Sequence, residues 1–152
     1  MSKKLLLIYH SQKGHNLKLA EACLTGIQKE EGLEIRFQKA SDTVLEDVLW
    51  ADGIILVTAE YFGYMSGAMK DFFDRTYYPA RDRNINIPYA LLVCSETDGT
   101  GCVRSIESLA PSYTLRRALE PLLIKEHVLE AGLSLAEEQG QTFAAGLVMG
   151  IF

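Results

Sequence analysis

The sequence predicts an α/β protein in which a parallel sheet of five strands carries helices on both faces. Apolar runs of strand length alternate along the chain with segments whose apolar residues recur at helical spacing. This alternation is typical of a doubly wound sheet in three layers. The polarity of each strand also indicates its place in the sheet, because central parallel strands are covered on both faces and are therefore uniformly apolar.

The first third of the chain contains two predicted strands and two predicted helices. Residues 4–9 are the first strand, and Leu5 to Tyr9 form its continuous apolar run. Apolar residues spaced three and four apart, from Leu17 to Ile27, then define one face of a helix. Apolar and polar residues alternate over 33–38, which indicates a second strand with one solvated face. Thr43 and Glu46 have the spacing of a capping box, so we expect a short helix that ends at Trp50.

The middle of the chain continues the alternation. Residues 53–57 and 89–94 are apolar runs and form the third and fourth strands. Residues 66–77 are predicted as a helix, with apolar side chains on one side and charge pairs four residues apart on the other. The segment 77–87 is interpreted as a solvated connector, although it could also contact a ligand or a neighbouring subunit.

The last third contains two helices and the fifth strand. A helix is predicted from 101 to about 119, with Pro111 bending it or splitting it in two. Residues 122–124 begin the last strand. Ser134 and Glu137 have capping-box spacing and predict a final helix that runs to about residue 149.

Strand polarity predicts the order 2-1-3-4-5. The alternating second strand belongs at one edge, and the fifth strand belongs at the other because Lys125, Glu126 and His127 interrupt its apolar run. An order beginning 3-2-1 is less favourable, since it would expose the apolar third strand. Ligands of such sheets bind beyond the carboxyl ends of the strands. Loops 10–16, 58–66 and 94–101 are therefore expected to form the site.

Composition restricts the classes of function. The 152 residues are 48% hydrophobic and 23% charged, which is ordinary for one globular domain spanning 1–152. A net charge of −5 without a basic run argues against nucleic-acid binding. No apolar stretch reaches about 18 residues, so we expect no membrane span. The three cysteines lack CxxC spacing, which favours free thiols in a reducing cytoplasm.

The first loop has the properties of a phosphate site. It joins a buried strand to the start of a helix, where free backbone N–H groups and the helix dipole favour an anion. Ser11 and Asn16 add side-chain donors, Gly14 allows close approach, and Lys13 and His15 add positive charge. The alternative is a plain turn in which Ser11 is only a cap. The glycine patterns of ATP-binding and dinucleotide-binding loops are absent.

The second loop places aromatic side chains beyond a buried strand. Tyr61, Phe62, Tyr64 and Met65 lie where side chains are expected to meet solvent. A flat heterocycle that stacks on them would explain their presence. Packing beneath neighbouring loops is the alternative.

The third loop combines two glycines with hydroxyl and carboxylate groups. Its backbone amides could face the edge of a ring. Glu96 and Asp98 have no neighbouring histidine or third carboxylate, so no metal site is predicted. Cys102 follows at the start of a helix, where its pKa could be lowered, although a buried and inert thiol is the preferred interpretation.

These motifs resemble the flavodoxin-like superfamily, most closely its WrbA-type NAD(P)H:quinone oxidoreductases and NADPH-dependent FMN reductases. Residues 9–15, Tyr-His-Ser-Gln-Lys-Gly-His, are similar to the Tyr-Tyr-Ser-x-x-Gly-His phosphate loop. Residues 62–70 are similar to the Phe-Gly-x-Met-Ser-Gly-x-Met-Lys segment, and Ser95 to Gly101 to the third flavin loop. The resemblance spans about residues 3–120. Ala59 departs from the usual proline, and the chain is shorter than the quinone reductases.

The resemblance implies a flavodoxin-like fold, FMN as cofactor, and a set of binding residues. The phosphate would be held by Ser11, Lys13, Gly14, His15 and Asn16. The isoalloxazine ring would be held by Glu60, Tyr61, Phe62 and Gly63 together with Ser95, Glu96, Thr97, Asp98 and Gly99.

Three hypotheses about function follow. The first is an NAD(P)H-dependent oxidoreductase that passes electrons through FMN to a quinone or flavin, or to a protein acceptor. The second is an electron-transfer flavodoxin without turnover, and the third is a protein that keeps the fold but has lost the flavin. Cations expected near the ligand end favour the first: Lys13, Lys70, Arg75, Arg81 and Arg83. A homodimer is compatible with the resemblance. No catalytic residue is assigned, although His10, His15 and Tyr61 are candidates for proton transfer or orientation.

Overall fold

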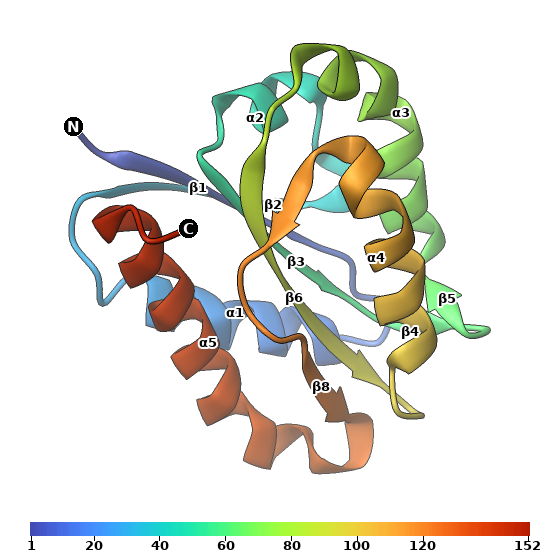
Figure 1. Ribbon diagram of the computed structural model, residues 1–152. Helices are drawn as coiled ribbons and strands as arrows, with labels where there is room; N and C mark the ends of the chain where they lie inside the picture. The colour runs from blue at the N-terminus through green and yellow to red at the C-terminus, as the bar shows by residue number, and fades with distance from the viewer.

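The computed structural model describes residues 1–152, and its main sheet is entirely parallel (Figure 1). The first four positions of the sheet hold one strand each, in the order β2 (Leu33–Lys39), β1 (Lys3–Tyr9), β3 (Gly53–Thr58) and β6 (Ile87–Ser95). The fifth position is shared by β7 (Leu115–Arg117) and β8 (Leu122–Lys125), which both pair with β6. The predicted order 2-1-3-4-5 is confirmed.

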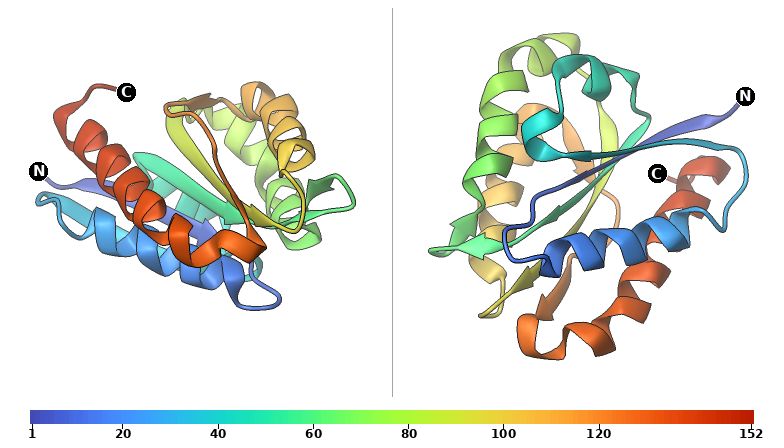
Figure 2. Two further views of the ribbon diagram at one scale, coloured as in Figure 1. Left: turned by 90° about the horizontal axis from the view of Figure 1, so that it is seen from below. Right: turned by 180° about the vertical axis from the view of Figure 1, so that it is seen from behind.

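Helices cover both faces of the sheet (Figure 2). One face carries α1 (His15–Ile27) and α5 (Leu129–Met149). The other face carries α2 (Leu45–Trp50), α3 (Gly67–Arg83) and α4 (Thr100–Tyr113). The predicted flavodoxin-like three-layer arrangement is confirmed. No helix combines the length and the apolar character that crossing a bilayer requires.

The apolar core consists of two clusters, one on each side of the sheet. In β1, Leu5 and Leu7 belong to the cluster under α1 and α5, whereas Leu6 and Ile8 belong to the cluster under α3 and α4. Successive side chains of a strand point to opposite faces. Both faces are buried here, and this explains why the central strands are uniformly apolar in sequence.

The fifth strand position corrects the predicted helix from 101 to about 119. Helix α4 ends at Tyr113, because Thr114 adopts a left-handed conformation with φ of 65° and Leu115 enters the sheet. Pro111 lies in the last turn of α4 and neither bends the helix into the next segment nor splits it. Ala118 donates a backbone hydrogen bond to Tyr89, and the chain then returns to the sheet as β8.

The end of α3 and the start of α5 also differ from the prediction. Helix α3 continues through Pro79 to Arg83, and its buried residue Ala80 extends the packed face beyond the predicted end at 77. Helix α5 begins at Leu129, directly after the 3-10 turn η2 (Glu126–Val128), and not at Ser134.

The short helix α2 also starts differently from the prediction. The Val44 N–H donates to Asp47 Oδ2 at 3.0 Å, so Asp47 provides the N-terminal contact of the helix. The Thr43 hydroxyl instead donates to the carbonyl of Lys39 at 2.7 Å and stabilises the preceding turn η1 (Ala40–Asp42).

Candidate functional site

The three predicted loops meet at the carboxyl edge of the sheet and enclose a cavity of about 570 Å³. This volume lies within the range of small-molecule sites. The cavity is lined by Lys13, Glu60, Tyr61, Phe62, Gly63, Glu96, Thr97 and Glu126. All of these except Glu126 are among the residues predicted from the sequence.

The turn before α1 has the geometry of an anion site. Gly14 precedes the helix with φ of 97°, a conformation that glycine adopts without steric cost. Its N–H donates to Ser11 Oγ at 3.1 Å, so Ser11 holds the turn together. The N–H groups of the first helical turn have no acceptor within the helix and carry the positive end of the helix dipole. These features favour a phosphate at this position.

The side chain of Asn16 has a different role from the predicted one. Its Nδ2 donates to the carbonyl of Cys94, and its Oδ1 accepts the Cys94 N–H, both at 3.1 Å. Only 4% of Asn16 is exposed. The side chain therefore joins the start of α1 to the end of β6, which leaves its backbone N–H as the group that could face a phosphate.

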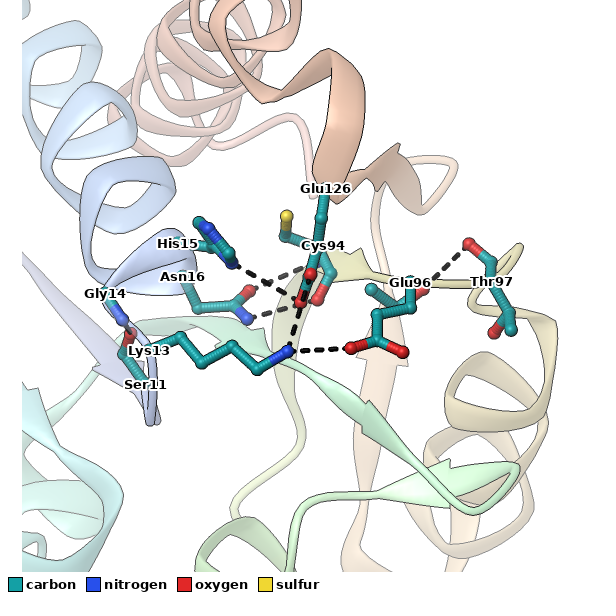
Figure 3. A network of polar contacts seen from close by, with 10 residues as sticks. Ser11, Lys13, Gly14, His15, Asn16, Cys94, Glu96, Thr97 and Glu126 are labelled. Carbon is teal, nitrogen blue, oxygen red and sulfur yellow. Dashed lines mark hydrogen bonds and ion pairs between the residues drawn. The ribbon is translucent and has the colours of Figure 1, made fainter.

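Charged side chains gather beside this turn (Figure 3). Lys13 Nζ lies 2.7 Å from Glu96 Oε1 and 3.7 Å from Glu126 Oε2. His15 Nδ1 lies 3.4 Å from Glu126 Oε1. The hydrogen bond to Glu96 raises the pKa of Lys13, and the same bond lowers the pKa of Glu96. The Lys13–Glu96 pair is exposed, so it adds little to the stability of the fold.

Glu126 was not predicted as a site residue. It follows β8, and its polarity was interpreted only as a sign that the fifth strand lies at an edge. The same sheet geometry that brought the other three loops together also brings the end of β8 to this edge.

The aromatic loop forms a hairpin of β4 (Glu60–Tyr61) and β5 (Tyr64–Met65). Phe62 and Gly63 form its two-residue turn with φ of 53° and 71°, as expected for a tight hairpin. Met65 is buried in the core, so packing explains that residue. Phe62 is fully exposed beside the cavity, so packing beneath other loops does not explain it.

Glu60 connects the hairpin to the third loop. Its Oε1 accepts the Thr97 hydroxyl at 2.6 Å, and its Oε2 accepts the Cys102 N–H at 2.8 Å. The second contact places a carboxylate at the N-terminus of α4, where the helix dipole favours negative charge. Glu60 therefore positions the wall of the cavity with its side chain.

The third loop divides into residues that line the cavity and residues that shape the loop. Ser95 donates to the carbonyl of Thr97 at 3.0 Å, and Gly99 precedes α4 with φ of 77°. Asp98 accepts hydrogen bonds from the N–H and hydroxyl of Thr100, which lower the pKa of Asp98. Ser95, Asp98 and Gly99 do not line the cavity, whereas Glu96 and Thr97 do.

The structure supports one further expectation and corrects another. Cys102 is fully buried, and burial raises its pKa to about 12, as the preferred interpretation of a buried thiol requires and the alternative of a lowered pKa does not. Arg81 and Arg83 lie in the last turn of α3, away from the carboxyl edge where α3 begins. The continuation of α3 beyond 77 carries these two cations to the opposite end of the sheet.

We expect Glu60→Gln to lower the free energy of unfolding by about 1 kcal/mol, since one charge-assisted hydrogen bond to α4 is replaced by a neutral contact. Urea denaturation would measure the change. Glu138→Gln, on the exposed face of α5, removes the same charge and is expected to leave the stability unchanged. Equal stability of the Glu60 variant and wild type would argue against the connecting role of Glu60.

Comparison with solved structures confirms the fold. A flavodoxin from the domain Archaea superposes with a TM-score of 0.79 at 18% identity, covering 95% of this chain and 98% of that one. The chain therefore has the flavodoxin-like fold.

The family assignment follows from the sequence. The family model described as NADPH-dependent FMN reductase matches residues 17–122. The chain belongs to this family, and the family indicates FMN as the cofactor.

Two curated relatives each match about half of the chain. One is a flavodoxin of Aquifex aeolicus, 39% identical over 71 residues, and the other is an NAD(P)H dehydrogenase (quinone) of Acidithiobacillus ferrooxidans, 30% identical over 93 residues. The aligned parts cover 47% and 48% of this chain, but only 38% and 46% of the relatives. The chain thus spans less than half the length of each relative.

Proposed function

We propose that this chain binds FMN at the carboxyl edge of the sheet and acts as an NAD(P)H-dependent oxidoreductase. The observation that carries the proposal is the junction of an anion-binding turn with a cavity for a flat ring. The small cavity at the turn and the large cavity beside the hairpin share Lys13, Tyr61 and Glu126. The pairing of an anion-binding turn with this larger cavity matches the chemistry of a ligand that carries a phosphate at one end and a ring at the other.

The residues present fit such a ligand. Ser11 holds the turn whose N–H groups would bind the phosphate, and Lys13 adds positive charge. Tyr61 and Phe62 would cover the ring, while the backbone from Ser95 to Gly99 would face its edge. Burial raises the pKa of Tyr61 and lowers the pKa of His10, so both side chains are neutral near pH 7. FMN, when bound, supplies the group that accepts a hydride from a nicotinamide.

The electron acceptor distinguishes two versions of this proposal. A quinone or a flavin is the acceptor that the quinone-dehydrogenase relatives favour. The match to the Aquifex aeolicus flavodoxin favours a second candidate, an electron carrier whose acceptor is a protein. A homodimer and a cytoplasmic location stay predictions.

Spectroscopy tests the proposal directly. We expect the purified protein, after incubation with FMN and removal of excess, to retain flavin absorbance, and we expect NADPH or NADH to bleach it without oxygen. Failure to take up FMN would contradict the proposal. Binding of FMN without bleaching by either nicotinamide would favour the electron carrier.

A variant of the turn tests where the phosphate binds. We expect Gly14→Ala to weaken FMN binding about tenfold, because a side chain disfavours the left-handed conformation by about 1–2 kcal/mol and the turn would relax. Gly150→Ala is the matched control, since Gly150 has φ of 70° and open space around it but follows α5, away from the cavity. Equal effects of the two variants on FMN affinity would place the phosphate elsewhere.

A further inference from the structure

One carboxylate of this chain lies where the proposed phosphate would bind. Glu126 begins the turn η2 after β8, and its side chain reaches back over the start of α1 (Figure 3). Its two oxygens lie 3.4 Å from His15 Nδ1 and 3.7 Å from Lys13 Nζ. Glu126 therefore contacts both basic side chains that the resemblance assigned to the phosphate.

The same side chain closes the space above the turn. The cavity bounded by Ser11, His15, Asn16 and Glu126 has a volume of only about 10 Å³. That volume is about enough for one water molecule and too small for a phosphate group. A phosphate can reach the turn only if the Glu126 carboxylate moves away.

The charges around the turn oppose a second anion. Lys13 faces two carboxylates, Glu96 at 2.7 Å and Glu126 at 3.7 Å. Burial keeps the neighbouring Tyr61 hydroxyl and Cys94 thiol neutral by raising their pKa values, and neither of them offsets these carboxylates. His15 is the other potential cation, and its Nδ1 already faces Glu126. A phosphate dianion entering while Glu126 stays in place would therefore meet a like charge at close range.

The structure offers the Glu126 side chain another position. A groove of about 420 Å³ lies on the far side of Glu126, lined partly by Lys18, His127 and Glu130. Lys18 Nζ lies 3.5 Å from Glu130, so a cation is already present in this groove. Rotation of the Glu126 side chain into this groove, toward Lys18, would open the turn.

We propose that Glu126 takes the place of the FMN phosphate when no phosphate is bound, and that it thereby sets how strongly the site prefers FMN to riboflavin. The proposal rests on the proposed FMN function and deepens it. Binding of FMN must displace the carboxylate from Lys13 and His15, which reduces the net gain from the phosphate. Riboflavin has no phosphate and does not compete with Glu126.

The isosteric variant Glu126→Gln separates the two ligands. We expect it to lower the dissociation constant of FMN about tenfold, because a like charge near the phosphate is removed at a partly exposed site. The dissociation constant of riboflavin should stay unchanged. Titration monitored by quenching of flavin fluorescence measures both constants. Glu138→Gln removes the same charge from an exposed position of α5 and should change neither constant.

Several outcomes would overturn the proposal. One is an unchanged or weaker affinity of the Glu126→Gln variant for FMN. Another is an equal gain for riboflavin, which would show that the carboxylate acts on the ring or on the cavity as a whole. An equal gain in the Glu138→Gln variant would show that the effect comes from net charge alone.

Inorganic phosphate gives a test that does not depend on flavin. At constant ionic strength, phosphate should raise the melting temperature of flavin-free Glu126→Gln more than that of wild type, since a ligand of the native state stabilises it. If no form of the protein takes up FMN, the proposed function fails, whereas the phosphate comparison still decides the role of Glu126. Equal stabilisation of wild type and variant by phosphate would contradict that role.

Discussion

The variant Gly26→Ala is expected to lower the free energy of unfolding by about 3 kcal/mol, although alanine is the better helix former by about 1 kcal/mol. Gly26 lies in α1 where this helix packs against α5. A Cβ atom there would overlap the Glu137 carbonyl oxygen and come within 2.7 Å of its carbon. These are backbone atoms, so the contact can be relieved only by moving one helix away from the other.

Each of the two helices contributes a glycine to the close contact between α1 and α5. Gly140 of α5 faces the backbone of Cys23 in α1, and a Cβ at Gly140 would lie 2.9 Å from Cys23 Sγ. Two glycines on facing helices thus allow a close approach, and separation would also loosen the packing of the buried Cys23 and Phe143. The protein interior is densely packed, so an added Cβ atom that overlaps its neighbours destabilises the fold.

Thermal unfolding measures the effect of Gly26→Ala as a melting temperature lower by about 10 °C. Gly67→Ala is the matched control, since Gly67 begins α3 and has open space where a Cβ would lie. It should be neutral or slightly stabilising. A Gly26 variant as stable as this control would show that the two helices are not in close contact.

The strands of this fold were predictable because burial on both faces leaves a clear pattern. Strands β1, β3 and β6 each contain an apolar run of at least five residues, and their place at the centre of the sheet follows from that. Strand β7 has only three residues, two of them exposed arginines, so its pattern is too short to recognise. Only Leu115 of this strand packs into the core, and one apolar residue is not a recognisable pattern.

Helix ends were less predictable because tertiary contacts replaced local caps. Ser134 and Glu137 have the spacing of a capping box, yet both lie inside α5, and Glu137 pairs with Lys29 of the neighbouring segment. The true start at Leu129 follows a 3-10 turn and has no side-chain cap. The first residue of α5 is buried, and its packing supports the start of the helix in place of a cap.

In the candidate site, as at the helix ends, the features that depend on the sequence pattern were predictable and those that depend on tertiary contacts were not. The topology of a doubly wound sheet placed three loops at one edge, and the sequence was sufficient for that step. The direction of individual side chains was not predictable. Glu60 contacts Thr97 and Cys102, 37 and 42 residues away, and Asn16 contacts Cys94, 78 residues away. Contacts at such separations depend on the register of the sheet, which the sequence pattern does not fix.

We expect Asn16→Ala to lower the free energy of unfolding by about 3 kcal/mol, because two hydrogen bonds are lost and the Cys94 N–H and carbonyl remain buried without partners. Cys94 is fully buried in the native structure, so its N–H and carbonyl are shielded from bulk solvent. Urea denaturation measures the loss. Amide hydrogen exchange at Cys94 should also become faster, because the Asn16 Oδ1 acceptor is gone.

Two comparisons separate this structural role from direct phosphate binding. Gln12→Ala changes an exposed amide in the same turn and should leave the stability within about 0.5 kcal/mol of wild type. If the Asn16 side chain instead bound the phosphate, Asn16→Ala would weaken FMN binding but leave the unfolding of the flavin-free protein unchanged. The observed pair of hydrogen bonds to Cys94 predicts the opposite result. Asn16→Ala should greatly lower the stability of the flavin-free protein. It should weaken FMN binding only to the extent that α1 moves away from β6.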